Sequence, residues 1–207
     1  MKLLLTAFDP FGGAAVNPAL EAVKLMGDIP GVALVKLEVP TVFGASIAAV
    51  TAAIEETLPD AVLCVGQAGG RAGLTPERIA INIDDARIAD NAGNQPIDQP
   101  IFPDGPAAYF STLPVKAMTA AIRAAGLPAE LSNTAGTFVC NHLMYGVLHH
   151  LATHHPGIRA GFLHVPFLPQ QGSPSLPLES IVTGIEAAIT AIRDHEKDIS
   201  SIEGSIH

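Results

Sequence analysis

Residues 132–142 read SNTAGTFVCNH, and within them the chain changes from a loop pattern to a helix pattern. Small, turn-forming residues end at Thr137, and the apolar residues from Phe138 onward recur at helical spacing. Cys140 is therefore predicted to lie in the first turn of a helix. Unpaired backbone N–H groups and the positive end of the helix dipole favour a thiolate there, the form that attacks carbonyl carbon. The simpler interpretation, an inert buried cysteine, stays open until its neighbours are known.

Outward from this stretch, apolar runs alternate with helical patterns along most of the chain. We expect strands at 2–7, 32–39, 61–65, 128–131 and 158–165, and a half-exposed strand within 76–88. Helices are expected at 18–26, 44–58, 114–125, 138–150 and 178–195. The alternation predicts an α/β protein, a single-domain three-layer α/β/α sandwich around a central, largely parallel (mixed) sheet. The domain should span 1–196, followed by a frayed tail at 197–207.

Composition narrows the class of protein and its partners. The 207 residues are 48% hydrophobic and 15% charged, which is typical of one well-cored domain. The formal charge is −9 and the 11 basic residues are scattered, so neither nucleic acid nor an anionic membrane is expected as a partner. No apolar run approaches the roughly 20 residues that span a bilayer. The two cysteines, Cys64 and Cys140, suggest no disulfide framework, so a reducing, cytoplasmic compartment is expected.

Cysteine catalysis needs a base within hydrogen-bond reach and a third group that orients the base. The carboxyl ends of parallel strands gather at one edge of a sheet, where ligands bind. Loops that follow such ends are expected at 8–13, 67–71, 132–140 and 164–169. His164 ends an apolar strand at this edge and is the best candidate base. For the third group the spacing leaves four acids open: Glu77, Asp84, Asp85 and Asp90.

Other conspicuous patterns receive structural interpretations. Four histidines near the end of the expected helix should stabilise its C-terminal dipole: His149, His150, His154 and His155. Neither an HExxH pattern nor a second cysteine joins them, so no metal and no cofactor are expected. His142, two residues after Cys140, points to a different helix face. The Gly-rich turn at 67–71 lacks both phosphate-binding signatures.

Four blocks of the sequence resemble one known family. They are FDPFGG at 8–13 with Asn17-Pro18, VGQAGGRAGLTPERIAINIDDARIADNAGNQPID at 65–98, SNTAGTFVCNHLMYG at 132–146 and GFLHVPFLPQQ at 161–171. In order and spacing they resemble the pyroglutamyl peptidase I (pyrrolidone-carboxylate peptidase) family of cytosolic cysteine exopeptidases. The resemblance implies peptides with an N-terminal pyroglutamate as substrates and a homotetrameric assembly. It also implies a catalytic triad of Glu77, Cys140 and His164.

The resemblance further suggests the groups that hold the substrate. Residues implied in substrate binding are Phe8, Phe11, Asn17, Gln67 and Phe138, the phenylalanines enclosing the flat lactam ring and Gln67 hydrogen-bonding it. The oxyanion donors would be the Cys140 N–H, at the helix N-terminus, and Arg87. Gln170 and Ala89 stand where family members commonly carry Glu and Pro.

Two alternatives to the peptidase remain at this point. A thiol amidohydrolase acting on another small cyclic amide would use the same triad, and only the phenylalanine-lined pocket argues against it. A non-catalytic small-molecule-binding α/β domain would instead use Cys140 for packing and the Gly-rich turn for an anion. Thiol reactivity separates a catalytic cysteine from a packed one.

Overall fold

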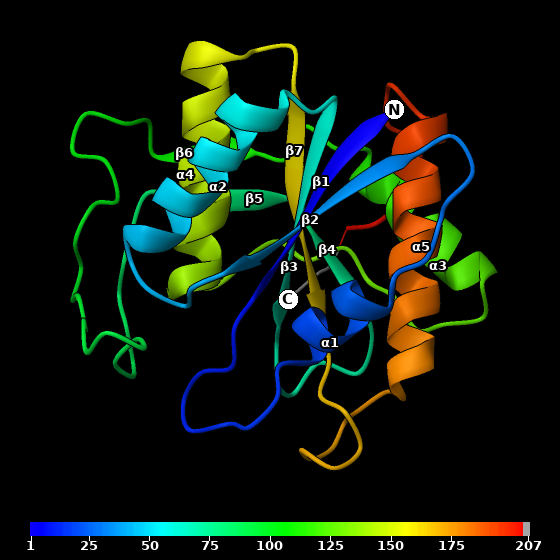
Figure 1. Cartoon of the computed structure of the whole chain (residues 1–207), viewed down its shortest axis with the longest axis horizontal. Helices are drawn as coiled ribbons and strands as arrows, with labels where there is room; N and C mark the ends of the chain where they lie inside the picture. Colours follow the sequence, from blue (N-terminus) through cyan, green and yellow to red (C-terminus); the bar gives the residue numbers. More distant parts are fainter. Residues whose placement is uncertain (205–207) are drawn as a thin grey trace.

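The centre of the protein is a five-stranded sheet in the order β2-β1-β3-β7-β4 (Figure 1), in a computed structural model that describes residues 1–204. Its strands are β1 Lys2–Phe8, β2 Ala33–Val39, β3 Ala61–Gln67, β4 Thr75–Glu77 and β7 Arg159–Val165. Neighbouring strands run parallel except β4, which is antiparallel to β7. A separate antiparallel ribbon pairs β5 Ile79–Ile81 with β6 Ala108–Phe110. The predicted mixed, largely parallel sheet is confirmed.

Helices cover both faces of this sheet (Figure 1). They are α1 Pro18–Leu25, α2 Ala45–Thr57, α3 Val115–Ala124, α4 Val139–His154 and α5 Leu178–Asp194. Side chains of α1, α3 and α5 share one apolar cluster with one face of the sheet, and those of α2 and α4 share a second cluster with the other face. The three-layer α/β/α sandwich is therefore confirmed. None of the helices within 1–204 is long and apolar enough to cross a membrane.

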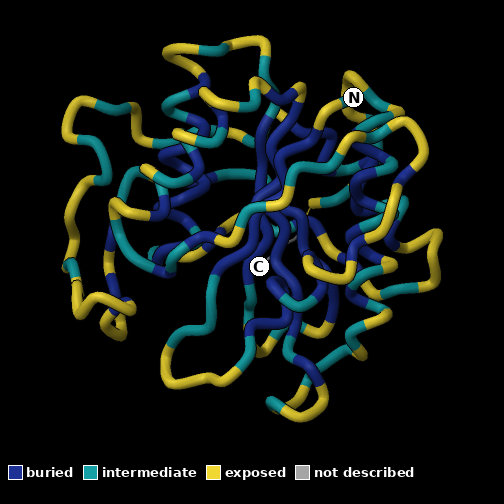
Figure 2. Tube along the Cα trace, in the orientation of Figure 1, coloured by how far each residue is buried: buried dark blue, intermediate teal, exposed yellow. Residues whose placement is uncertain are grey.

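The position of the middle strands between two layers of helices explains why their sequences are continuous apolar runs. Residues 3–8 of β1, 61–66 of β3 and 160–165 of β7 are all buried (Figure 2), because helices lie on both sides of them. The outer strand β2, with only one neighbour, alternates between exposed and covered positions instead. Burial at the centre holds the carboxyl ends of β1, β3 and β7 in fixed positions at one edge of the sheet.

Asn17 shapes both the first helix and the loop that precedes it. Its Oδ1 accepts a hydrogen bond from the backbone N–H of Ala19 at 3.0 Å, as expected of an N-cap, and Pro18 occupies the first helical position. Its Nδ2 donates to the backbone carbonyl of Asp9 at 3.2 Å. One buried side chain therefore starts α1 and closes the loop that follows β1.

The structure differs from the sequence-based expectation in two segments. The strand expected within 76–88 is divided into β4 and β5, because β4 pairs with β7 whereas β5 pairs with the distant β6. The strand expected at 128–131 was wrong: this segment forms only single bridges, from Ala129 to Leu74 and from Ser132 to Glu77. Both segments lie at the edge of the sheet, where neighbours distant in sequence decide the pairing.

The segment after α5 packs against α3. Pro114, the N-cap residue of α3, makes no side-chain cap. The carboxylate of Asp198 caps α3 instead, because it accepts hydrogen bonds from the backbone N–H groups of Lys116 and Ala117 at 2.9–3.1 Å. Further along, Glu203 pairs with Arg123 at 2.9 Å. Fraying was expected from residue 197, whereas these contacts extend to residue 203; residues 205–207 lie outside the described part of the chain.

Removing this cap should destabilise the protein. We expect Asp198→Ala to lower the free energy of unfolding by about 1 kcal/mol, because two backbone donors lose their acceptor and the N-terminal dipole of α3 loses a negative charge. Urea unfolding followed by circular dichroism measures the change. Glu196→Ala, in the same exposed segment and without a hydrogen bond in residues 1–204, is the matched control. Equal effects of the two substitutions would contradict the capping role.

Candidate active site

His164 and Glu77 meet where β7 pairs with the edge strand β4. In this antiparallel ladder Thr75 lies opposite His164, and Glu77 lies opposite Phe162. Glu77 and His164 are therefore diagonal neighbours on one face of the sheet. The Nδ1 of His164 donates to Oε1 of Glu77 at 2.7 Å, and both side chains are almost completely buried. The hydrogen bond leaves Nε2 as the ring nitrogen that can accept a proton.

This pairing distinguishes one acid among the four that the sequence left open. Within residues 1–204, no other candidate carboxylate bonds His164. Asp84 accepts a hydrogen bond from Nδ1 of His142 at 2.8 Å, so both of these side chains are engaged elsewhere. Asp90 accepts from backbone N–H groups of its own loop and of Phe43. Asp85 is exposed to solvent.

Arg71, which the sequence analysis did not select, completes the buried group. Its Nη1 lies 2.5 Å from Oε1 of Glu77 and also hydrogen-bonds the hydroxyl of Thr75. Its Nη2 donates to the backbone carbonyl of Thr134 at 3.0 Å. The guanidinium therefore compensates the buried charge of Glu77 and joins the Gly-rich turn to the loop before Cys140.

Cys140 is the second residue of α4, as the sequence predicted. The N-cap residue Phe138 makes no side-chain cap, and within residues 1–204 the N–H of Cys140 has no hydrogen-bond acceptor. The next side chain, Asn141, is buried and bonds the backbone of Ile81 through both its oxygen and its nitrogen at 2.9 Å. The first turn of α4 is thus fixed against the chain that follows β5, with unpaired donors at its start.

Gly66 makes room for the sulfur of Cys140. A Cβ atom on Gly66 would lie 3.0 Å from Sγ of Cys140 and 2.7 Å from the ring of Phe162. Gly66 is also the register partner of His164 in the parallel pair β3–β7. Because paired residues project to the same face, the imidazole of His164 and the sulfur of Cys140 lie on the same side of the sheet. No hydrogen bond joins them in the described residues, and such contacts often tighten only when substrate binds.

Burial determines the protonation of both groups. It raises the pKa of the Cys140 thiol to about 12; the charge of Glu77 raises it further and that of Arg71 opposes the shift. Burial and the charge of Glu77 therefore oppose the thiolate that the helix dipole favours. Burial also lowers the pKa of His164 below its usual 6.5, against the opposite effect of the hydrogen bond to Glu77. Both shifts favour the uncharged forms of these side chains, and uncharged His164 can act as a base.

Aromatic side chains from three loops gather beside the start of α4. The rings of Phe11 and Phe138, both predicted in the pocket, lie 6.1 Å apart. Phe43, which the sequence analysis did not select, meets Phe138 edge-on at 5.4 Å. The structure therefore brings two of the three predicted phenylalanines together and adds a third from the entry to α2.

A cavity of about 520 Å³ opens between the loops after β1 and β7. Its apolar walls include Phe11, Ile88 and Phe167, and its polar groups include Gln67 and Gln171. The side-chain oxygen of Gln67 accepts a hydrogen bond from Gln171 at 3.2 Å. A mostly apolar cavity with a few oriented amides is typical of a site for a small, uncharged ligand.

Three other predicted residues lie in different surroundings. Phe8 is only 2% exposed and packs with Phe162 at a ring distance of 6.3 Å, beneath the surface of the site. Both ends of the Asn17 amide are engaged with backbone groups, as described above. Arg87 is exposed and makes no ion pair within residues 1–204. Their substrate and oxyanion roles remain predictions.

Comparison with known proteins identifies the family. A family model described as pyroglutamyl peptidase matches residues 1–195. The chain belongs to the pyroglutamyl peptidase family. It is 62% identical over 198 residues to a pyrrolidone-carboxylate peptidase of Levilactobacillus brevis, covering 93% of this chain and 97% of that protein. It is 58% identical over 215 residues to one from Streptococcus pyogenes, covering 100% of both chains.

Solved structures of the family share the fold. The crystal structure of pyroglutamyl peptidase I from Bacillus amyloliquefaciens has a TM-score of 0.94 at 50% identity, covering 97% of this chain and 98% of that chain. The pyrrolidone carboxyl peptidase of Thermococcus litoralis has a TM-score of 0.93 at 36% identity, covering 97% and 98%. The pyroglutamyl peptidase fold therefore applies to nearly the whole chain.

Besides Phe43, two further residues of this candidate site were not selected from the sequence, Arg71 and Gly66. Arg71 lies in the Gly-rich turn, which was tested only for phosphate-binding signatures. A basic residue six positions before a candidate buried acid was a usable signal, because a buried carboxylate requires a partner. Gly66 lies inside an apolar strand and gave one weaker signal, since a strand glycine often marks close approach of another group.

A side chain at position 66 should disturb the site. We expect Gly66→Ala to lower kcat roughly 100-fold, because the new methyl group displaces the sulfur of Cys140 from its position over β3. Overpacking against Phe162 should also lower the free energy of unfolding by about 1–3 kcal/mol. Kinetics on a pyroglutamyl amide and urea unfolding measure the two effects. Gly27→Ala is the control, since a methyl group there meets nothing within 4 Å; wild-type kinetics of Gly66→Ala would refute the close contact.

Proposed function

We propose that this protein hydrolyses the amide bond after an N-terminal L-pyroglutamyl residue of peptides, as a cysteine exopeptidase. The family match over 1–195 and relatives named pyrrolidone-carboxylate peptidase support the substrate. One observation supports the mechanism most directly: His164 is oriented by buried Glu77 on the same side of the sheet as the sulfur of Cys140. This is the arrangement of nucleophile, base and orienting acid that acyl transfer requires.

The proposed first step is acylation of Cys140. Its sulfur attacks the carbonyl carbon that joins pyroglutamate to the next residue, while Nε2 of His164 takes the thiol proton. Because burial raises the pKa of the thiol, its proton must pass to His164 before or during the attack. Glu77 holds the imidazole and stabilises its charged form, and Arg71 keeps the carboxylate in place. His164 then gives the proton to the departing amine, leaving a thioester on Cys140.

The second step is hydrolysis of the thioester. His164 takes a proton from water, which attacks the thioester carbonyl, and the thiol is regenerated as pyroglutamate leaves. Both tetrahedral intermediates carry an oxyanion that needs donors. The unpaired N–H of Cys140, at the positive end of α4, is the donor that the geometry favours. Arg87 would have to turn inward from its exposed position to contribute.

The pocket explains a preference for pyroglutamate over ordinary N-terminal residues. The lactam is flat and uncharged and has no free α-amine, so its recognition requires apolar contact and few hydrogen bonds. Phe11 and Phe138 provide apolar ring faces, and Gln67, oriented by Gln171, offers an amide to the lactam. A protonated α-amine would lose its hydration in such a pocket without gaining a partner.

The first experiment measures release of a fluorogenic amine from its L-pyroglutamyl amide, with the prolyl amide as substrate control. We expect the protein to cleave only the pyroglutamyl amide and Cys140→Ala to be inactive because it has no nucleophile. Cys64→Ala, which removes the other, fully buried thiol, should retain activity. Cleavage of both amides would favour a broader amidohydrolase. Absence of cleavage by the folded protein would favour the non-catalytic binding domain.

The pH dependence tests the role of Glu77. Activity requires neutral His164, whose pKa is lowered by burial, so the acid limb of kcat/KM should lie below about pH 6.5. The hydrogen bond to Glu77 raises this pKa. Glu77→Gln should therefore move the acid limb to still lower pH, in addition to lowering kcat. A pH profile of kcat/KM measures both; an acid limb that stays in place or moves upward would contradict this orienting role.

We also propose a homotetrameric state and a cytoplasmic location. Large apolar side chains are exposed between β5 and α3, with Ile97 at 69% exposure in the loop and Phe110 at 66% at the end of β6, which supports contacts between copies of the chain. Both cysteines are free thiols, which supports a reducing compartment. Light scattering of the purified protein measures the oligomeric state.

A further inference from the structure

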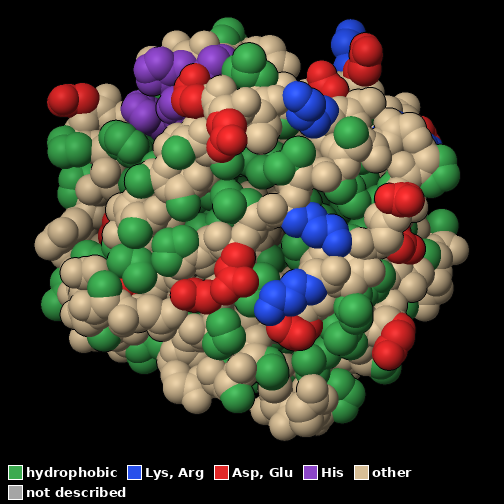
Figure 3. All heavy atoms as spheres, in the orientation of Figure 1, with side chains coloured by type: hydrophobic (Ala, Val, Ile, Leu, Met, Phe, Trp, Pro, Cys, Tyr) green, Lys and Arg blue, Asp and Glu red, His purple; other side chains and the backbone are tan. Residues whose placement is uncertain are grey.

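A second group of chemically active side chains lies at the opposite end of α4 from Cys140. Histidine side chains gather on one part of the surface, next to acidic ones (Figure 3). They belong to the last turn of α4 and the residues after it. At about 1.5 Å per residue, the helix separates Cys140 from His155 by roughly 22 Å. This group is therefore distinct from the proposed active site.

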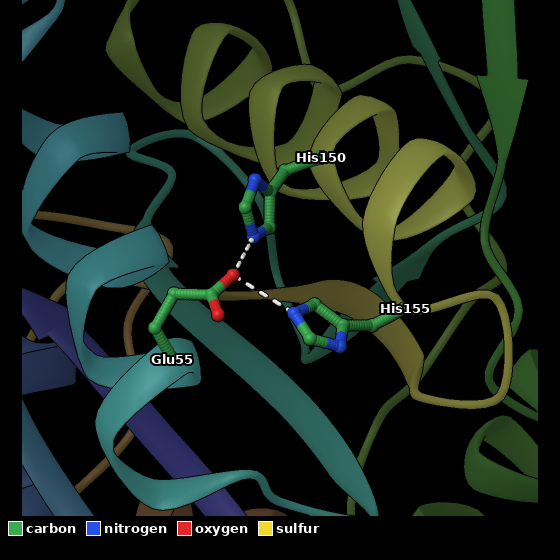
Figure 4. A group of neighbouring side chains, drawn as sticks. All are labelled: Glu55, His150 and His155. Carbon is green, nitrogen blue, oxygen red and sulfur yellow. Dashed lines mark hydrogen bonds and ion pairs between the residues drawn. The ribbon is translucent and has the colours of Figure 1, made fainter.

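Three of these side chains converge on one point (Figure 4). Glu55 comes from α2, His150 from α4, and His155 is the residue that caps the end of α4. The Oε1 atom of Glu55 lies 2.9 Å from Nε2 of His150 and 2.8 Å from Nε2 of His155. The three atoms all lie within 4.8 Å of one another.

Close packing of the two helices holds this arrangement. Gly146 lies against Ile47 of α2, so near that a Cβ on Gly146 would overlap the Ile47 side chain. The helices therefore approach closely, and Glu55 faces the end of α4 across their contact. Two of the ligand atoms come from packed helices, and the third comes from the C-cap residue of α4.

The three side chains are accessible and hold lone pairs suited to a cation. The side chains of His150 and His155 are 18% and 24% exposed, and that of Glu55 is 52% exposed. Each Nε2–H donates to Glu55 in the structure; because within residues 1–204 neither Nδ1 has a hydrogen-bond partner, each ring can move its proton to Nδ1 and offer Nε2 to a cation.

The donor set indicates which ion fits. Two imidazoles and one carboxylate match the ligands of zinc sites that leave further positions to water. Ligand atoms of a tetrahedral zinc ion lie about 3.3 Å apart, so small side-chain rotations from the present spacing suffice. Magnesium and calcium prefer oxygen ligands only. The negative end of the α4 dipole also favours a cation at this place.

We propose that Glu55, His150 and His155 bind one zinc ion, which links the end of α2 to the end of α4. From the sequence, these histidines were expected only to stabilise the helix dipole, because Glu55 lies about 100 residues away in the chain. The proposal does not depend on the proposed peptidase function. Ion binding should stabilise the folded protein by an amount that grows with the logarithm of the zinc concentration above the dissociation constant, since the site is assembled only in the folded state.

Calorimetry with zinc chloride tests the site in a tag-free, full-length Cys140→Ala protein, which lacks the thiol of the proposed active site. We expect one zinc ion per chain, no binding of magnesium, and a melting temperature that rises with zinc. Glu55→Gln and His150→Gln should each weaken binding by about 10-fold or more. Each of these two substitutions is also made in the protein that retains Cys140. Its peptidase activity, measured with EDTA present, should be unchanged.

Matched substitutions keep the test specific. Glu56→Gln removes the neighbouring exposed carboxylate, and His154→Gln removes a neighbouring exposed histidine that is not among the three ligands. Both should bind zinc as the parent protein does. Melting temperatures in EDTA show whether each variant is folded. Absence of zinc binding by the folded parent, or equal binding by Glu55→Gln and Glu56→Gln, would overturn the proposal.

Discussion

The register between β3, β7 and β4 is the constraint on which the site depends. Because side chains alternate between faces, the parallel pairing of Gly66 with His164 turns the imidazole toward the layer that contains α4. The antiparallel pairing of β4 with the same strand brings Glu77 to that face one diagonal step away. A slip of one residue in either pairing would send His164 or Glu77 to the opposite layer. The short edge strand β4 thus fixes the position of the proposed orienting acid.

Burying Glu77 imposes a second constraint. An ionised carboxylate that is fully buried is costly unless charged or hydrogen-bonding groups compensate it, and Arg71 and His164 do so here. A buried group of paired charges is weak evidence that the folded protein is stabilised, because well-packed apolar side chains in its place often give at least the same stability. The more direct consequence of these ion pairs is that they fix the positions of the segments around Cys140. Arg71 connects the turn after β3, the strand β4 and the loop before α4, so the groups around Cys140 share one set of contacts.

Local sequence predicted most of the fold and part of the site. Continuous apolar runs predicted β1, β3 and β7, which are buried on both faces. The Asn17-Pro18 pair predicted the start of α1. Edge pairing was not predictable, because a segment such as 128–131 forms a strand only if a neighbour distant in sequence offers a complete ladder. The acid in the site could not be chosen from spacing for the same reason: its distance from His164 is set by the turn that leads into β4. The resemblance to the family selected Glu77, and the hydrogen bond to His164 is consistent with that choice.

The protonation of Cys140 shows why a local rule was insufficient. The helix-terminus argument considers the dipole of α4 alone and favours a thiolate. In the folded protein the sulfur lies over β3, close to the Phe162 ring and to the charge of Glu77, and the loss of hydration raises the pKa of the thiol against the effect of the dipole. The dipole and the unpaired N–H groups still act, but on negative charge that develops during the reaction rather than on the resting thiol. At the other end of α4 the same dipole has the opposite sign, and there the chain places imidazoles beside a carboxylate. One helix therefore offers two separate electrostatic environments, the first suited to a transient anion and the second to a bound cation.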